Sequence, residues 1–181
     1  MIMAQRQLGR PDKRDLYYKD RQYLNTWAAG TAEWLQDSYL DVSQRASYFQ
    51  IAYSTAPAMV MRTINAGSKY PFTVKDADGE FLNGSNVYKL HLPPNPPAAL
   101  FWAVTAYNIT DGTMVEAAQM MPSINGYDKV ASNSDGSIDL WFARKPLRAV
   151  PLATRFRFQK SGAETGAGRH GSCTSRITIA L

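Results

Sequence analysis

The chain has 181 residues, with an apolar fraction of 45% and an aromatic fraction of 12%, which excludes a disordered chain and indicates one folded domain. No apolar run approaches the roughly 20 residues of a membrane span, and Met1 to Arg14 lacks the apolar core of a secretory signal. A single cysteine, Cys173, excludes a disulfide framework and a multi-cysteine metal site.

The net charge of +5 is confined to the C-terminal part of the chain. Residues 1–142 hold 12 Lys and Arg against 14 Asp and Glu, a net of −2, whereas residues 143–181 hold 8 against 1, a net of +7. The basic residues of this tail lie among Gly, Ala, Ser and Thr without a periodic apolar face. Nucleic-acid binding through the tail is a distant alternative, and no nucleic-acid partner is expected for the domain itself.

The N-terminal third predicts a mobile lead-in over residues 1–15 and a helical connecting segment over residues 16–68. Thr31 to Gln36 is typical of a short helical turn. Asp41 to Tyr53 carries apolar residues over three turns and predicts the main helix, with Ser43 as its N-cap. Pro57 ends that stretch, and Ala58 to Asn65 predicts a second short helix.

From residue 69 to residue 142 the pattern changes to short strands separated by turn dipeptides. Strands are expected at Tyr70–Val74, carrying an edge proline, at Val87–Leu92, after Ala99 and at Ser137–Phe142, with a loop beginning at Met120. Turns are expected at Asp78-Gly79, Asn83-Gly84 and Asp135-Gly136. Four prolines between Pro93 and Pro97 make a stiff connection that cannot pair as a strand. The domain is therefore expected to be mainly β.

Candidate chemistry is sparse. His91, the one histidine before residue 143, is a candidate catalytic base, although a hydrogen-bonded sheet histidine is the simpler interpretation. Its ligation of a metal together with Asp76, Asp78 or Glu80 is the weaker interpretation, because Asp-x-Asp-Gly is ordinary turn chemistry. No metal and no cofactor are expected.

Four aromatic residues are candidates for an apolar ligand pocket, with burial in the core as the alternative. They are Phe101, Trp102, Tyr107 and Trp141.

An ordered series of motifs resembles the C-terminal part of a bacterial two-domain family of unknown function. The motifs are Leu16-Tyr-Tyr-Lys-Asp-Arg-Gln22, Thr55-Ala-Pro-Ala-Met59, Gly67-Ser-Lys-Tyr70, Asp76-Ala-Asp-Gly-Glu80, Lys89-Leu-His-Leu-Pro-Pro-Asn95, Phe101-Trp102 and Asn133-Ser-Asp-Gly-Ser137. The two halves of that family are the domains of unknown function numbered 1254 and 1214, and this chain is similar to the second half with its connecting segment.

The resemblance implies an antiparallel, jelly-roll-like β-sandwich with an N-terminal helical segment, and no established activity. A lipase-like or virulence-associated role has been suggested for the family, and no catalytic residue can be carried over. The family's N-terminal domain has no counterpart here, and the end of the resemblance after Phe142 predicts an incomplete sandwich. The cellular compartment stays open: the lack of a signal peptide in this chain indicates the cytoplasm, whereas members of the family can be exported.

The resemblance ends after Phe142, and residues 143–181 are predicted to be disordered or an out-of-frame reading. Reverse translation of Ala143 to Gly162 permits, in a shifted frame, the Pro-Lys-Ala-Pro series with which the family continues. A sandwich without its last strands is expected to expose strand edges and apolar surface at Val104 and Trp141 and to self-associate. The leading hypothesis is a ligand-binding or assembly module, with the small-molecule or lipid ligand unknown, and the alternative is an esterase-like hydrolase using His91.

Overall fold

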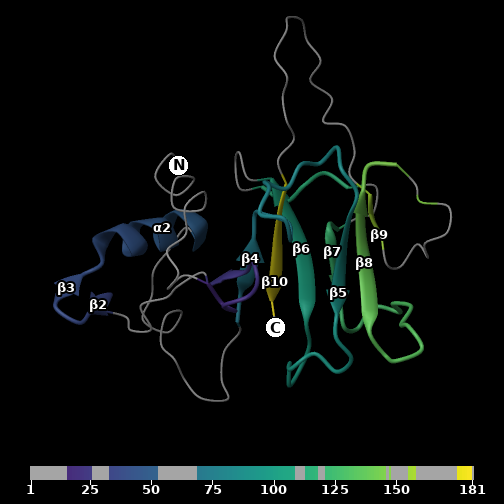
Figure 1. Ribbon diagram of the computed structural model, residues 1–181, viewed down its shortest axis with the longest axis horizontal. Coiled ribbons are helices and arrows are strands. Elements are labelled where there is room, and N and C mark those ends of the chain that lie inside the picture. Colours follow the sequence, from purple (N-terminus) through teal and green to yellow (C-terminus); the bar gives the residue numbers. More distant parts are fainter. Residues whose placement is uncertain are drawn as a thin grey trace, which may run out of the picture.

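The computed structural model describes residues 16–25, 33–52, 69–108, 113–117, 121–145, 147, 155–157 and 175–180. Within these ranges the protein is mainly β (Figure 1). The elements are β1 Leu24–Asn25, β2 Leu35–Gln36, β3 Tyr39–Leu40, α2 Val42–Ala52, β4 Pro71–Thr73, β5 Tyr88–Leu92, β6 Ala103–Asn108, β7 Ser123–Asn125, β8 Ile138–Ala143, β9 Arg155–Arg157 and β10 Ser175–Ala180.

The larger sheet has five strands in the order β1-β4-β10-β6-β7, and every neighbouring pair is antiparallel. β10 lies between β4 and β6 and pairs along its whole length with β6, from Ser175 opposite Asn108 to Ala180 opposite Ala103. Residues from the C-terminal end of the chain are thus in the middle of the sheet, as Figure 1 shows.

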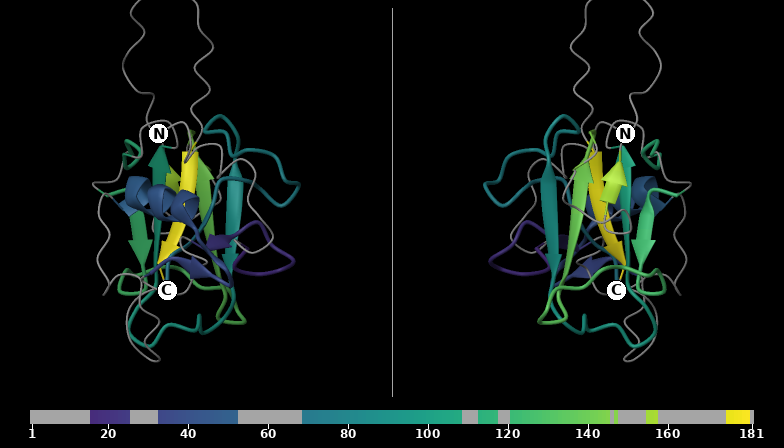
Figure 2. Two further views of the ribbon diagram at one scale, coloured as in Figure 1. Left: turned by 90° about the vertical axis from the view of Figure 1, so that its left-hand side faces the viewer. Right: turned by 90° about the vertical axis from the view of Figure 1, so that its right-hand side faces the viewer.

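The smaller sheet has the order β5-β8-β9. β5 pairs antiparallel with β8, with Leu90 opposite Leu140, whereas β9 runs parallel to β8. The side views in Figure 2 show the strands of both sheets standing next to one another and α2 on one side of them. The prediction of antiparallel strands is confirmed for most pairs, and β8–β9 is the parallel exception.

One buried cluster is built from both sheets. Residues alternate in and out along each strand, so that Val104 and Ala106 of β6 are buried, as are Leu140 and Phe142 of β8. Other buried members come from β5, β7 and the connecting segments, namely Leu82, Leu92, Trp102, Val115 and Ile124. Ile138 shares this inward face of β8 with Leu140 and Phe142, since it packs against the same cluster.

Residues 16–25 lie at one edge of the larger sheet, where β1 is the edge strand next to β4. Leu24 of β1 packs with Phe72 and with Val74 just after β4, and Leu16 packs against them. Tyr23, next to Leu24, packs against the main cluster instead. Burial raises the pKa of Tyr23 to about 12, and the nearby positive charge of Arg21 opposes this only in part.

A hairpin and a helix lie beyond β1 and β4, on the left of Figure 1. β2 and β3 pair through Leu35 opposite Leu40, and α2 begins directly after β3. The prediction of Ser43 as the N-cap is wrong, because the Asp41 carboxylate accepts the backbone N–H of Gln44 at 3.0 Å. Thr31 to Gln36 was expected to form a helical turn, but Leu35 and Gln36 are in a strand.

Two predictions for the sheet region are also corrected. Ser123–Asn125 is the strand β7 rather than a loop, because its pairing with β6 overrides a short and weakly apolar local pattern. Pro71 is not on an edge strand, since β4 has neighbours on both sides. It is tolerated as the first residue of its strand. The predicted helix at Ala58–Asn65 lies outside the described residues.

The expected exposure of Val104 and Trp141 is not found. Val104 is fully buried, and its strand β6 is paired with both β10 and β7. Trp141 is half-buried, and its strand β8 has β5 and β9 as neighbours. The strands β9 and β10 both come from residues 143–181. The out-of-frame origin of that region remains a prediction.

Candidate functional site

The outward face of β5 and β8 brings polar and aromatic side chains together. Because strand residues alternate between faces, Lys89 and His91 of β5 point away from the core and are exposed. The register places Lys89 opposite Trp141 and His91 opposite Asp139. We call these four residues the outer-face site.

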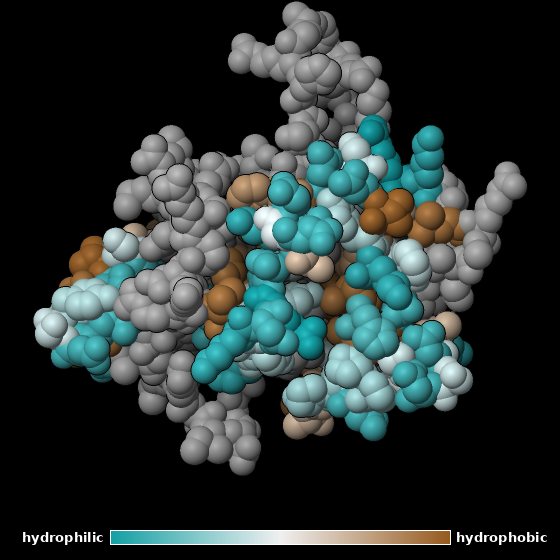
Figure 3. Space-filling model, in the orientation of Figure 1, coloured by the Kyte–Doolittle hydropathy of each residue, from teal (hydrophilic) through white to brown (hydrophobic). Residues whose placement is uncertain are grey.

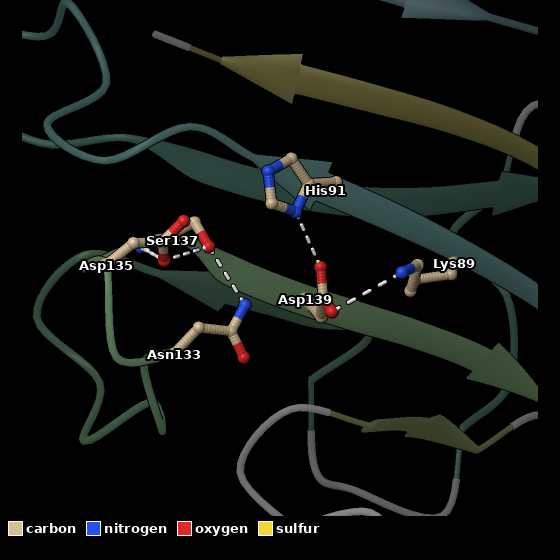
Figure 4. Close-up of polar contacts among 6 residues, drawn as sticks. All are labelled: Lys89, His91, Asn133, Asp135, Ser137 and Asp139. Carbon is tan, nitrogen blue, oxygen red and sulfur yellow. Dashed lines mark hydrogen bonds and ion pairs between the residues drawn. The ribbon is translucent and has the colours of Figure 1, made fainter.

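Asp139 is the centre of the polar contacts in this site, as Figure 4 shows. Its Oδ1 lies 2.7 Å from Nδ1 of His91, and its Oδ2 lies 3.5 Å from Nζ of Lys89. The hydrogen bond from His91 and the nearby ammonium of Lys89 hold the pKa of the Asp139 carboxyl below its ordinary value. The Lys89 Nζ also lies 5.8 Å from the centroid of the Trp141 ring, within cation–π distance.

A tight turn leads into β8 beside this site. Gly136 has φ +83° and Asp135 receives both the backbone N–H and the hydroxyl of Ser137, the latter at 2.6 Å. The Asn133 side-chain amide donates to the same Ser137 hydroxyl at 2.9 Å. These hydrogen bonds from Ser137 lower the pKa of Asp135. The predicted Asp135-Gly136 turn is confirmed, since glycine readily adopts a positive φ.

The arrangement supplies two of the three parts of an acyl-transfer triad. In such a triad the histidine is the base, and the carboxylate that accepts its Nδ1–H orients it. Ser137 does not supply the nucleophile that would be the third part, because it is 1% exposed and its hydroxyl donates to Asp135. In the described part of the chain no hydrogen bond joins His91 to Ser137, and Figure 4 shows the two side chains apart.

In the acidic turn considered as a metal site, the Asp76 carboxylate accepts hydrogen bonds from the backbone of the turn itself. The Asp76 carboxylate accepts the N–H groups of Asp78 and Glu80, at 3.1 and 3.0 Å, and Gly79 has φ +84°. This is the turn chemistry expected from Asp-x-Asp-Gly. His91 instead contacts Asp139, and the described residues contain no group of three or more potential metal ligands.

The four candidate pocket aromatics lie in different surroundings. Trp102 is buried in the core cluster, and Gly126 lies so close that a Cβ there would be 3.1 Å from its Nε1. Phe101 is exposed and packs against Tyr127, with ring centroids 5.8 Å apart. Tyr107 is near the other end of β6, and Trp141 is on the outer face of the smaller sheet.

Two residues that contribute to these surfaces, Asp139 and Tyr127, were not singled out from the sequence. Asp139 sits in the strand pattern as an ordinary solvent-facing residue, and only the β5–β8 register reveals its pairing with His91. The sequence signal that could have found it was its alternation with Ile138 and Leu140 on a strand next to the one that carries His91. Tyr127 follows a strand that was predicted to be a loop.

The fold and the site define a mainly β protein without an assembled catalytic triad in its described residues. Residues 67–154 match the family model described as "Protein of unknown function (DUF1214)". The match supports the 1214 half of the resemblance and runs 12 residues past Phe142, where the resemblance was expected to end. No curated protein matches the chain. The 1254 partner and the two-domain organisation remain predictions.

Two solved structures resemble the chain. The VPA0106 protein from Vibrio parahaemolyticus matches with a TM-score of 0.52 at 14% identity, over 84% of this chain and 34% of its own. A putative uncharacterized protein from Burkholderia cenocepacia matches with a TM-score of 0.38 at 12% identity, over 82% of this chain and 40% of its own. The chain thus spans well under half the length of either structure, and the Vibrio likeness bears on the fold alone. Among the described residues, no helix is long and apolar enough to cross a membrane.

Proposed function

We propose that this protein is a jelly-roll-like β-sandwich module that binds a ligand at the outer-face site without chemical turnover. The observation that carries the proposal is the composition of that site. A half-buried aromatic ring, Trp141, lies beside a cation, an imidazole and a carboxylate on the outward face of two paired strands. A few convergent polar groups next to an aromatic surface are typical of small-molecule binding sites.

The ligand class that fits is a polyhydroxylated molecule such as an oligosaccharide. A sugar ring presents a C–H face that packs on an indole, and hydroxyls at its edge that both donate and accept hydrogen bonds. The site offers the matching groups, because Lys89 can donate, Asp139 can accept, and the free Nε2 of His91 is turned away from Asp139. Lys89 is 47% exposed and rests on Trp141 with a weak surface contact, so a ligand can displace it at small cost.

The sandwich part of the proposal is supported by the shared core. Side chains from the inner faces of β6 and β7 pack with those of β5 and β8 in one cluster. Packing between two inner faces is what holds a β-sandwich together, and it leaves the opposite faces free for binding. The outer-face site lies on such an opposite face.

Isothermal titration calorimetry with a panel of linear neutral and uronic hexasaccharides tests the proposal. We expect saturable binding of at least one class and a loss of about tenfold or more in affinity on Trp141→Ala. Phe81→Ala is the matched control, because Lys75 lies 5.1 Å from the Phe81 ring in a similar cation–π contact elsewhere. Binding that is absent, or that Phe81→Ala weakens as much as Trp141→Ala, contradicts the proposal.

The hydrolase remains the alternative, favoured by one observation. The 2.7 Å contact between His91 and Asp139 has the geometry of an oriented base. The alternative requires a nucleophile to approach the exposed side of His91, and Ser137 could do so only by breaking its bond to Asp135 and leaving its buried position.

A further inference from the structure

Helix α2 is apolar on two sides. One side carries Tyr48, which is buried and packs on Trp34 with ring centroids 5.4 Å apart. Another side carries Val42 and Phe49, which are 60% and 50% exposed. Because residues i and i+7 lie above one another on a helix, these two side chains share a face, with Arg45 and Ala46 between them. A helix on the surface of a single domain needs only one apolar side, the side that packs against the rest of the domain.

The β2–β3 hairpin adds to this surface. Leu35 and Leu40 are opposite each other in the register, so they lie on the same face of the hairpin. They are 57% and 46% exposed. The Asp41 N–H donates to the Trp34 carbonyl at 2.8 Å and fixes the hairpin to the start of α2. Leu35, Leu40, Val42 and Phe49 together are called the hairpin–helix surface, and Figure 3 shows apolar side chains at this end of the molecule.

The exposed apolar area of this surface is close to the apolar area that one copy contributes to a standard dimer interface. Four side chains of this size, each about half exposed, present about 400 Å² of apolar area. A standard interface buries about 800 Å² per partner, of which about 60% is apolar. The hairpin–helix surface therefore supplies most of the apolar part of such an interface.

We propose that the hairpin–helix surface binds the same surface of a second copy about a two-fold axis, with the two α2 helices antiparallel. An axis near Ala46 places Val42 of one copy against Phe49 of the other, and the small Ala46 side chain lets the helices approach. The hairpin–helix surface belongs to α2 and the β2–β3 hairpin and shares no residue with the outer-face site, so the dimer does not depend on the proposed ligand.

Sedimentation velocity of the full chain over a range of concentrations tests the dimer. We expect a reversible monomer–dimer equilibrium whose dissociation constant rises about 30-fold or more on Phe49→Asp. Leu100→Asp is the matched control, because Leu100 is 83% exposed but far from α2 in the chain, and it should leave the equilibrium unchanged. A chain that stays monomeric at every concentration, or a dimer that Leu100→Asp weakens equally, overturns the proposal.

Crosslinking gives a second, geometric test that does not depend on weakening the dimer. In an Ala46→Cys, Cys173→Ser double variant, mild oxidation should produce a disulfide-linked dimer, because the two introduced thiols meet near the axis. The exposed position Ala99, changed to cysteine in the same background, should not crosslink. Crosslinking that is equal at both positions contradicts the antiparallel arrangement. Oligosaccharide binding by Phe49→Asp should be unchanged, so failure of the dimer and failure of the ligand site are distinguishable.

Discussion

His91 and Asp139 face each other across β5 and β8, with Nδ1 of the histidine 2.7 Å from Oδ1 of the aspartate. The two residues are 48 positions apart in the chain, and the strand register alone brings them together. The contact orients the imidazole of a side chain that is 53% exposed, and the other ring nitrogen is turned away from Asp139. The same face of β5 and β8 also holds Lys89 and Trp141, which is why we interpret the pair as part of a binding face.

Acid should weaken the fold through Asp139, and Asp139→Asn should reduce that effect. The folded pKa of Asp139 lies below 3.8, its ordinary value, because His91 donates to it. A depressed pKa contributes stability that is complete above the unfolded value and is lost as the pH falls through the folded value. Urea unfolding at several pH values between about 2 and 6 measures how steeply the free energy of unfolding falls with decreasing pH. An acid limb that is equally steep in wild type and Asp139→Asn would contradict this role.

Ester hydrolysis by the wild-type protein should not exceed that of His91→Ala. The reason is that the Ser137 hydroxyl is buried and donates to Asp135, so it is not available for His91 to activate. Initial rates of p-nitrophenyl butyrate hydrolysis by the wild-type protein and by His91→Ala test this prediction. Saturable turnover that disappears in both His91→Ala and Ser137→Ala would establish the hydrolase and reject a binding module without turnover.

Leu140→Ala should destabilise the protein far more than Leu100→Ala. Leu140 is fully buried where the two sheets meet, so its truncation leaves a cavity and is expected to cost about 3 to 5 kcal/mol in the free energy of unfolding. Leu100 is 83% exposed, and its truncation should cost about 0.5 kcal/mol or less. Chemical denaturation gives both values, and similar costs for the two changes would argue against the shared core.

Removal of residues 175–181 should abolish cooperative unfolding. β10 pairs with β4 on one side and along six residues of β6 on the other, so its loss splits the sheet and leaves one edge each of β4 and β6 unpaired. Deletion of residues 1–15, predicted as a lead-in, is the control. If thermal unfolding followed by circular dichroism is unchanged without residues 175–181, the out-of-frame prediction for residues 143–181 gains support, and sequencing of the encoding DNA across Asp139 to Arg148 would settle it.

Local sequence patterns predicted the strands and turns that can be recognised from a few neighbouring residues. Alternation predicted β5 and β8, and the dipeptides Asp78-Gly79 and Asp135-Gly136 predicted turns whose glycines have positive φ. His91 was interpreted as a hydrogen-bonded sheet histidine, and it lies in β5 with its Nδ1 2.7 Å from Oδ1 of Asp139. Each of these inferences needed only a few neighbouring residues.

Features that depend on distant pairing could not be predicted in this way. β7 is three residues long and exists because β6 pairs with it. The alternation of Ile177 and Ile179 in β10 is a local strand signal that was overlooked in the basic tail, whereas the position of β10 between β4 and β6 follows from contacts with residues far away in the chain. The partnership of Asp139 with His91 likewise depends on register, which a one-residue slip would abolish.

The outer face of β5 and β8 is expected to bind a polyhydroxylated ligand. Two-dimensional ¹H–¹⁵N spectra of labelled protein, titrated with the hexasaccharide panel, test it most directly. We predict saturable shifts of the Trp141 indole N–H and of backbone amides in β5 and β8, with the indole N–H of Trp102 unaffected in the core. Shifts centred on Phe101 and Tyr127 instead, or no saturable shift with any member of the panel, would contradict it.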